Sequence, residues 1–474
     1  MNIVLINAPY VDSYGAVRNA VGRYFPLGLG YIAAVLRRDG HQVLLLDPEA
    51  QTMQLADIDR VIMNSQPELV GISSATPNFP GAVELCRRIK KLNNCAVIVG
   101  GVHASAMPLE ILENVEAFDY VAVGEGEYLM SELATCIEKG DREGIKGIDG
   151  LAYRDEGYGP MFKGRRPAIG DLDELPMPAR DLVDMSLYRP HAHNYRHKRS
   201  ATMLTSRGCP ARCSFCASHV VHGRRFRAHS PRRVLDEVEE LYYKYKIRHI
   251  LIQDDTFTVN KARVHEICDL IIASNMQLSW FCFARANTVD EELLKKMKRA
   301  GCYSIGFGVE SGSNDLLRSI EKGLTIEVIQ RSVMLANKLG FKTQTFFIFG
   351  HPQETVSQAK ATIKAALSLN SQLAFFNIMI PFPGTDIFEA LPDKVAITAE
   401  LGNFVAVGTK PIDGISNLSS AQISAFVKEA NIRYYFRVSQ IVRMIMGVSG
   451  LNELREYIRG LVALVRQVSR IGKS

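Results

Sequence analysis

Several features that would place the chain in a specialised class are missing. No uninterrupted apolar stretch reaches about 18 residues, so the sequence predicts no membrane-spanning helix. The first six residues are apolar and strand-like and lack the cationic region and cleavage site of a signal peptide, so we expect a cytoplasmic location. No repeat of fixed period and no low-complexity tract is visible. These absences leave a globular protein of ordinary composition.

A strong excess of charge of one sign is also missing. Fifty-six Lys and Arg face 50 Asp and Glu, giving a formal net charge of +6. This mild excess does not by itself indicate binding to nucleic acid, and no nucleic-acid partner is expected. The length of 474 residues exceeds one ordinary core and predicts two or three domains.

Cysteine is scarce, with nine in the chain, and three of these stand close together. Cys209, Cys213 and Cys216 form a C-x-x-x-C-x-x-C run behind the strand-like segment 201–206. Structural zinc usually takes four ligands, often as two C-x-x-C pairs, and no second pair occurs. A disulfide is disfavoured in the reducing compartment that we expect. Three such thiolates suit three irons of a 4Fe-4S cluster, which leaves the fourth iron without a protein ligand.

Residues 1–138 alternate short apolar strands with segments of helical periodicity. This alternation predicts a doubly wound, Rossmann-like parallel sheet, with strands at 3–7, 42–46, 69–73, 96–99 and 120–123. Ligands of such sheets bind beyond the carboxyl ends of the strands. Those ends carry polar or glycine-rich turns: Asn7-Ala8-Pro9, Ser73-Ser74-Ala75, Gly100-Gly101-Val102-His103 and Gly124-Glu125-Gly126-Glu127. We therefore expect a bulky ligand at this edge.

Residues 139–199 are predicted to be a linker. They are rich in Gly, Pro, Asp and Arg, and the proline-containing run 171–181 cannot be the interior of a helix. We expect a semi-rigid strap that holds the first domain over the next one. His191, His193 and His197 have no acidic or thiol partner spaced with them, so a polar loop is favoured over a metal site.

Residues 200–385 alternate six apolar strands with helices, which predicts a partial (β/α)6 TIM-like barrel. The predicted strands are 202–206, 249–253, 279–283, 304–308, 345–349 and 375–380. In barrels of this kind the active site lies at the carboxyl ends of the strands. Polar or turn-forming residues follow every strand: the three cysteines, Asp254-Asp255, Arg285, Glu310-Ser311, Gly350-His351-Pro352 and Pro381-Phe382-Pro383-Gly384. An active site at this rim is the prediction.

Motifs in both units resemble a known family. The cysteine spacing, with the aromatic Phe215 before the last cysteine, resembles the radical S-adenosylmethionine (SAM) superfamily. Glu310, in Gly306-Phe307-Gly308-Val309-Glu310-Ser311-Gly312, is similar to the fourth-strand motif of that superfamily. The Gly100-Gly101-x-His103 turn and the segment 123–127, placed ahead of such a core, resemble the cobalamin-binding domain of cobalamin-dependent radical SAM enzymes.

The resemblance implies three cofactors, a 4Fe-4S cluster, SAM and cobalamin, and the residues that hold them. The cluster is expected on Cys209, Cys213 and Cys216, with its open iron chelated by SAM. Contacts to SAM are expected from Phe215, Asp254, Arg285, Glu310 and Ser311. Contacts to cobalamin are expected from Pro9, Ser73, Ser74, Gly100, Gly101, His103, Gly124 and Glu125. His351 and Gln353 stand where small or apolar residues are common in the family, so the resemblance says less about the substrate side.

The resemblance also implies a reaction. One electron, from a donor such as flavodoxin or ferredoxin, would cleave SAM reductively to a 5′-deoxyadenosyl radical. The expected outcome is methylation of an unactivated carbon or phosphorus centre of a small molecule or lipid. Three alternatives remain open: a cyclisation or rearrangement without methyl transfer, a non-catalytic cobalamin or nucleotide sensor, and a zinc-bound scaffold protein.

Residues 386–474 are predicted to be a helical C-terminal region. The segments 431–446 and 452–469 read as amphipathic helices that carry Arg433, Arg437, Arg443, Arg455, Arg459 and Arg466. Basic amphipathic helices can lie at an anionic membrane surface, cap the barrel or bind a partner. Peripheral membrane contact is one of these three expectations.

Overall fold

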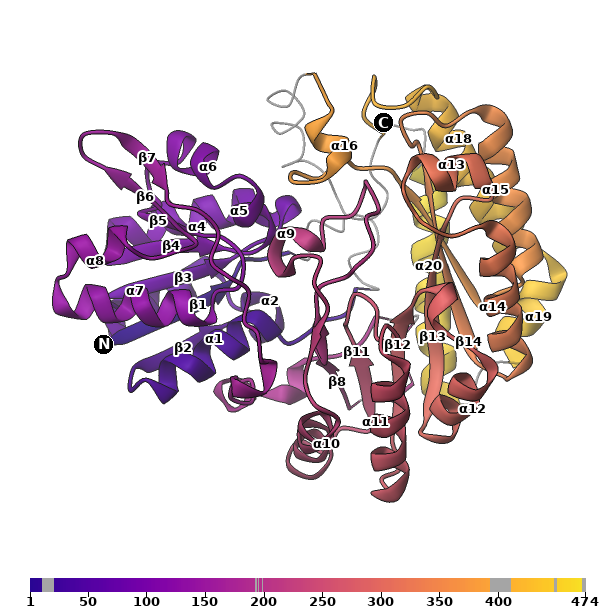
Figure 1. Cartoon of the computed structure of the whole chain (residues 1–474), viewed down its shortest axis with the longest axis horizontal. Coiled ribbons are helices and arrows are strands. Elements are labelled where there is room, and N and C mark those ends of the chain that lie inside the picture. Colours follow the sequence, from indigo (N-terminus) through magenta and orange to yellow (C-terminus); the bar gives the residue numbers. More distant parts are fainter. Residues whose placement is uncertain are drawn as a thin grey trace.

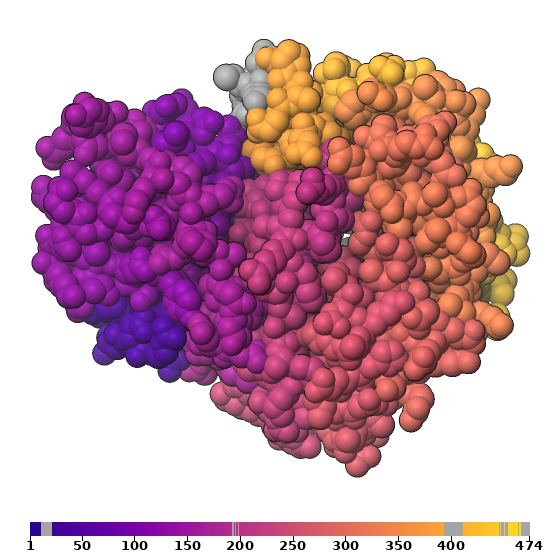
Figure 2. All heavy atoms as spheres, in the orientation of Figure 1, coloured from indigo at the N-terminus to yellow at the C-terminus, as the bar shows by residue number. Residues whose placement is uncertain are grey.

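Figure 1 shows the computed structural model of the chain. It describes residues 1–10, 21–191, 194, 196–197, 199–392, 411–446 and 450–470. Two α/β units lie side by side, and the space-filling view in Figure 2 shows the first unit packed against the magenta beginning of the second. His193, one of the histidines considered above, lies outside the described residues.

The first unit is built on a seven-stranded sheet of order β2-β1-β3-β4-β5-β6-β7. The first five strands run parallel, and the last two are antiparallel to their neighbours. The strands are β1 Asn2–Asn7, β2 Gln42–Leu46, β3 Leu69–Ser73, β4 Ala96–Gly100, β5 Tyr120–Ala122, β6 Leu151–Asp155 and β7 Gly159–Phe162.

Helices cover both faces of this sheet, because successive side chains of a buried strand point to opposite faces. On β1, Ile3 and Leu5 belong to the core shared with α1 and α7, whereas Val4 and Ile6 belong to the core shared with α3 and α4. The helices are α1 Leu27–Arg38, α2 Pro48–Gln51, α3 Leu55–Ser65, the 3-10 turn Thr76–Asn78, α4 Phe79–Leu92, α5 Val102–Ala106, α6 Pro108–Asn114, α7 Glu127–Lys139 and α8 Arg142–Lys146.

The predicted linker 139–199 contains more regular structure than the sequence indicated. Its first part supplies β6 and β7, a hairpin that extends the sheet beyond β5. The remainder contains short 3-10 turns at Leu172–Glu174, Arg180–Leu182 and Met185–Leu187. The fully buried Arg180 donates to the backbone oxygen of Thr202 (3.1 Å) and to Glu237 (2.6 Å), which fixes this strap to the second unit. The domain boundaries given above stay predictions.

The second unit is a six-stranded parallel sheet curved into a partial barrel, of order β15-β14-β13-β12-β11-β8. Its strands are β8 Ser200–Met203, β11 His249–Ile252, β12 Ser279–Ala284, β13 Cys302–Glu310, β14 Lys342–Phe349 and β15 Leu373–Ile378. A short antiparallel pair, β9 Ser206–Arg207 and β10 Arg227–Ala228, follows the first strand. The helices are α9 His219–His222, α10 Pro231–Glu239 with the π-turn Glu240–Lys244, α11 Lys261–Ala273, the 3-10 turn Ala286–Thr288, α12 Glu291–Arg299, α13 Asn314–Ser319, α14 Ile326–Lys338, α15 Val356–Leu369 and α16 Asp386–Glu389.

Three helices make up the described C-terminal region: α18 Ser420–Tyr435, α19 Val438–Met446 and α20 Leu451–Arg470. Helix α18 packs against β15 and α15, and α20 contacts α18. The single helix predicted for 431–446 was wrong, because the chain breaks between α18 and α19. Tyr434 and Tyr435 end α18 by donating to the backbone oxygens of Ser371 and Ala374, which anchors that end on the barrel. The described part of the chain contains no helix long and apolar enough to span a bilayer. The predicted fold class is confirmed.

Candidate active site

The three cysteines lie in the loop between β9 and α9, at the carboxyl end of the barrel. All three thiols are free, and Cys213 is the most buried. The backbone N–H of Cys216 donates to the oxygen of Cys213 (3.1 Å), which tightens the loop. Gly208 leads into it with a φ of +81°, and a Cβ there would lie 2.3 Å from the backbone oxygen of Arg225. Only glycine fits at this approach to the loop.

The loop borders a cavity of about 250 Å³ inside the barrel rim. Several predicted site residues meet there: Cys209, Cys213, Phe215, Cys216, Arg285 and Glu310, joined by Asp255 and Lys322. No three His, Cys, Asp or Glu side chains of the described chain converge on a single metal-ion position. A cluster fits this arrangement better than one ion, because each thiolate would then ligate a different iron.

Glu310 ends β13 and pairs with Lys322 across the cavity wall. The Lys322 ammonium lies 2.7 Å from Glu310 Oε1, and both side chains are almost fully buried. Glu310 has a φ of +67°, a conformation that a non-glycine residue adopts at a cost. This backbone conformation and the ion pair together fix a carboxylate and an ammonium opposite the cysteines.

Arg285, at the end of β12, is held by two contacts. One guanidinium nitrogen lies 3.7 Å from Cys213 Sγ, and the other donates to the backbone oxygen of Lys322 (2.5 Å). The arginine therefore links the cysteine loop to the loop that carries Lys322. Its positive charge therefore lies beside the sulfur of Cys213.

Two predicted SAM contacts, Asp254 and Ser311, do not line the cavity. Asp254 is fully buried and accepts hydrogen bonds from the Thr205 backbone N–H (2.6 Å) and from the hydroxyls of Thr205 and Ser206. Ser311 lies 3.1 Å from the hydroxyl of Thr362 behind the rim. The neighbouring Asp255 is the carboxylate that borders the cavity, and burial raises its pKa.

The turn after β14 places His351 behind Phe215. Their ring centroids are 5.7 Å apart, and His351 is fully buried. Neither of its ring nitrogens has a hydrogen-bond partner among the described residues. Burial, and then the charge of Lys322, lower the pKa of His351 to about 4, so its ring is neutral. Burial raises the pKa of Glu354, three residues on, to about 7.

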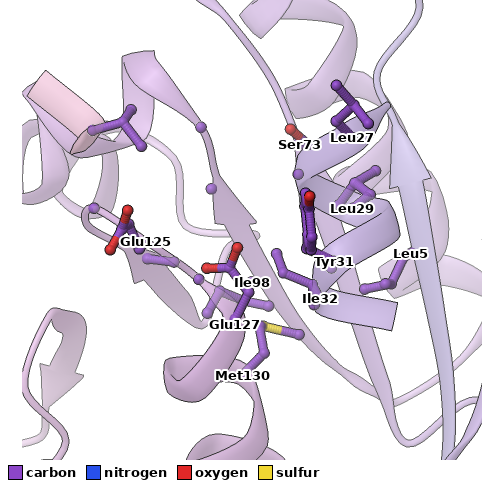
Figure 3. Close-up of a pocket in the computed structure, with 18 of the residues that line it drawn as sticks. Leu5, Leu27, Leu29, Tyr31, Ile32, Ser73, Ile98, Glu125, Glu127 and Met130 are labelled. Carbon is purple, nitrogen blue, oxygen red and sulfur yellow. The ribbon is translucent and has the colours of Figure 1, made fainter. Parts of the chain in front are cut away.

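A second cavity of about 300 Å³ lies at the carboxyl edge of the first sheet. Figure 3 shows its wall, with apolar side chains of β1, α1 and α7 beside the carboxylates of Glu125 and Glu127. The predicted residues Ser73, Gly100, Gly101, Gly124 and Glu125 line it, together with Glu127 of the predicted turn. The sequence reasoning missed Tyr31, Arg207 and His222. Its mainly apolar wall with a few fixed polar groups suits a large cofactor.

Pro9, Ser74 and His103 do not line this cavity. The backbone N–H of Ser74 donates to Gly100 (3.0 Å), so this residue shapes the floor instead. His103 is buried in α5, with Nδ1 3.2 Å from the Thr76 hydroxyl, and burial lowers its pKa to about 4. The prediction that His103 contacts the ligand therefore has no support in the geometry.

Glu125 ties the second cavity to the barrel. Its carboxylate accepts hydrogen bonds from both terminal nitrogens of Arg227 (2.9 Å each), from Arg207 (3.1 Å) and from the backbone N–H of Ile169 (2.8 Å). Arg207 also donates to Glu127 (2.6 Å). Burial opposes ionisation of Glu125, but His222, Arg207 and Arg227 outweigh it and hold its pKa far below the ordinary value.

The short helix α9 is a wall common to both cavities. Ser218 and His219 border the cysteine cavity, whereas Val221 and His222 border the second one. Arg207, which binds both glutamates, stands two residues before Cys209. The geometry therefore places two ligand-sized spaces next to each other, joined by buried ion pairs.

Comparison with known proteins accounts for both spaces. The Radical SAM superfamily model matches residues 203–366, and the B12 binding domain model matches residues 15–134. The chain is 34% identical over 470 residues to the uncharacterized methyltransferase PH0819 of Pyrococcus horikoshii, covering 98% of this chain and 99% of that protein. The chain belongs to the cobalamin-dependent radical SAM methyltransferase family.

Two further proteins are similar to this chain at lower sequence identity. The anaerobic magnesium-protoporphyrin IX monomethyl ester cyclase of Rubrivivax gelatinosus is 28% identical over 417 residues, covering 86% of this chain and 73% of that protein. The radical SAM methyltransferase TsrM from Kitasatospora setae, solved with cobalamin and a [4Fe-4S] cluster bound, shares the fold, with a TM-score of 0.73, 20% identity and full coverage of both chains.

Proposed function

We propose that this methyltransferase holds a 4Fe-4S cluster on Cys209, Cys213 and Cys216, SAM in the adjoining barrel cavity and cobalamin in the second cavity. The observation that carries the proposal is the shared wall α9, which places the two cavities on either side of one helical turn. When bound, these groups would supply one-electron cleavage of SAM and delivery of a methyl group. The chain itself binds, orients and shields them.

Different residues of the barrel cavity bind, orient and shield these groups. Arg285 offsets the negative charge of the cluster thiolates, since its guanidinium already lies against Cys213. Glu310 and Asp255 offer carboxylates to the amino and hydroxyl groups of SAM, and the ion pair with Lys322 holds Glu310 in place. Phe215 closes the cavity on the side of His351.

The methyl acceptor in this proposal is an unactivated carbon or phosphorus centre of a small molecule or lipid. The electron would come from a cytoplasmic one-electron donor such as flavodoxin or ferredoxin. Support for methyl transfer comes from the resemblance to PH0819 over nearly the whole of both chains.

A second candidate is cyclisation or rearrangement without methyl transfer. It is favoured by the similarity to the Rubrivivax cyclase over 86% of this chain. SAM labelled in its methyl group separates the two reactions: methyl transfer predicts labelled product, and unlabelled product from the reconstituted enzyme would contradict it.

Assays for SAM cleavage address a third possibility, a non-catalytic sensor. Protein purified without oxygen, loaded with cluster and cobalamin and then reduced, is expected to release 5′-deoxyadenosine from SAM. The matched control is the variant Cys216→Ser treated in the same way. Equal release from both proteins would contradict the assigned cluster site.

A further inference from the structure

The C-terminal helices carry a concentration of exposed apolar side chains. Among the described residues, 18 large apolar side chains are exposed, and 11 of these lie between residues 432 and 465. They are Ile432, Phe436, Val438, Ile441, Val442, Met446, Leu454, Ile458, Leu461, Val462 and Val465. Scattered exposed apolar residues need no explanation, whereas a concentrated set marks an interaction surface.

On α20 these side chains form a continuous stripe. Leu454, Ile458, Leu461, Val462 and Val465 fall within a sector of about 100° at the helical period, and their exposed fractions run from 39% to 54%. The helix also contacts the barrel, since the Lys342 ammonium lies 5.7 Å from the centre of the Tyr457 ring. The stripe therefore stays exposed while another residue of the same helix contacts the barrel.

Arginines border this stripe along one edge. Arg455 is exposed beside Leu454, and Arg459 follows one turn later with Glu456 as its ion-pair partner (2.7 Å). The sequence has further arginines at positions 466 and 470. A stripe of aliphatic residues beside a row of arginines is the pattern of a helix that lies in the plane of a membrane interface.

The net charge of the whole chain comes from this region. Residues 431–474 contain eight Lys and Arg and two Glu, a net charge of +6 that equals the total for the chain. The first 430 residues therefore contain 48 basic and 48 acidic residues. A second copy of the chain would bring an equal positive charge to the same surface, so self-association there is opposed. An anionic surface, in contrast, is attracted by the positive charge of residues 431–474.

We propose that the stripe of α20 docks the enzyme on the surface of an anionic lipid bilayer. The aliphatic side chains enter the boundary between headgroups and acyl chains, and the bordering arginines contact the lipid phosphates. The docking is peripheral and reversible. It is a property beyond the proposed reaction and does not depend on which methyl acceptor is correct.

Vesicle co-sedimentation of the full-length, cofactor-loaded enzyme tests the proposal. We expect binding to vesicles of phosphatidylcholine mixed with phosphatidylglycerol, weaker binding as salt is raised, and little binding to phosphatidylcholine alone. Ile458→Glu should lower the partition coefficient at least about tenfold, because it puts a charge in place of an aliphatic group that enters the bilayer. Arg455→Glu should weaken binding to anionic vesicles as well.

The matched control is Met63→Glu, which makes the same change in charge at an exposed apolar residue of α3 in the first domain. This variant should bind vesicles like the wild type. Cobalamin content and 5′-deoxyadenosine release, measured for every variant, report whether the fold is intact. Absence of binding by the wild type, or equal loss in Met63→Glu and Ile458→Glu, would overturn the proposal. So would a stable dimer in light scattering that Ile458→Glu converts to monomer while vesicles are not bound.

Discussion

Glu125 of the first domain and Arg227 of the barrel form a buried bidentate ion pair, with both N–O distances at 2.9 Å. The two residues are 102 positions apart in the chain. They couple the cavity at the edge of the first sheet to the strand pair that leads into the cysteine loop. Buried ion pairs therefore join the two domains, in addition to the strap that connects them in the chain.

Replacing Glu125 should therefore be costly. Glu125→Gln keeps the shape but leaves Arg227 without a carboxylate partner and Arg207 with Glu127 alone. Breaking such a buried pair costs about 3–5 kcal/mol of the free energy of unfolding. The control Glu132→Gln removes a half-exposed partner of Arg166 and should cost less than about 1 kcal/mol. Urea denaturation measures both. Similar losses would show that the buried network is not what joins the domains.

Substitution of Gly101 should damage the second cavity specifically. Gly101 has a φ of +105°, and a Cβ there would lie 2.2 Å from the backbone oxygen of Ser74. Gly101→Ala should cost about 2–4 kcal/mol and weaken cobalamin binding, read by absorbance. The control Gly140→Ala has a φ of +66° but open space around it, and should cost only about 1 kcal/mol. Unchanged cobalamin affinity in Gly101→Ala would argue against this site.

Glu354 should make stability depend on pH in a definite direction. Its pKa is raised to about 7 from an ordinary 4.5, so the folded protein binds more protons than the unfolded chain between these values. The contribution of Glu354 to the free energy of unfolding is therefore full below pH 4.5 and falls as pH rises to about 7, by no more than about 3 kcal/mol. Urea denaturation at pH 5 and at pH 8 gives the free energy of unfolding of the wild type and of Glu354→Gln. A difference between the two proteins that does not change with pH would refute the raised pKa.

Glu310 should contribute to SAM binding. A charge-assisted hydrogen bond contributes about 1.5–3 kcal/mol, so Glu310→Gln should raise the dissociation constant of SAM about tenfold or more. The control Glu327→Gln alters an exposed glutamate in the first turn of α14, which accepts from Asn314. Equilibrium dialysis with the cluster-loaded protein gives both values. Equal affinity in the two variants would remove Glu310 from the SAM site.

The sequence predicts the fold well because buried parallel strands are short apolar runs with turn residues at their ends. It fails where that contrast is weak: β6 and β7 lie in a stretch rich in glycine, proline and charge, and they were not expected. The break between α18 and α19 was missed for another reason. At this break Tyr434 and Tyr435 donate hydrogen bonds to the barrel, and helical periodicity contains no information about such contacts.

The site was predicted in part for similar reasons. The cysteines, Arg285 and Glu310 follow strand ends, and the barrel brings them to one cavity. Sequence alone does not say which of two adjacent carboxylates faces a cavity, so Asp254 was chosen where Asp255 lies. Arg207 and Arg227 were missed because their partner Glu125 is 82 and 102 residues away. The sequence around a buried arginine contains no pattern that identifies its ion-pair partner.

The most direct test of the central claim is the iron and sulfide content of protein reconstituted without oxygen. The account predicts equal amounts of iron and sulfide in the wild type, loss of both in Cys213→Ser, and retention in Cys268→Ser, which alters a buried core thiol away from the cavity. Iron and sulfide that survive in Cys213→Ser, or zinc in place of iron in the wild type, would contradict it.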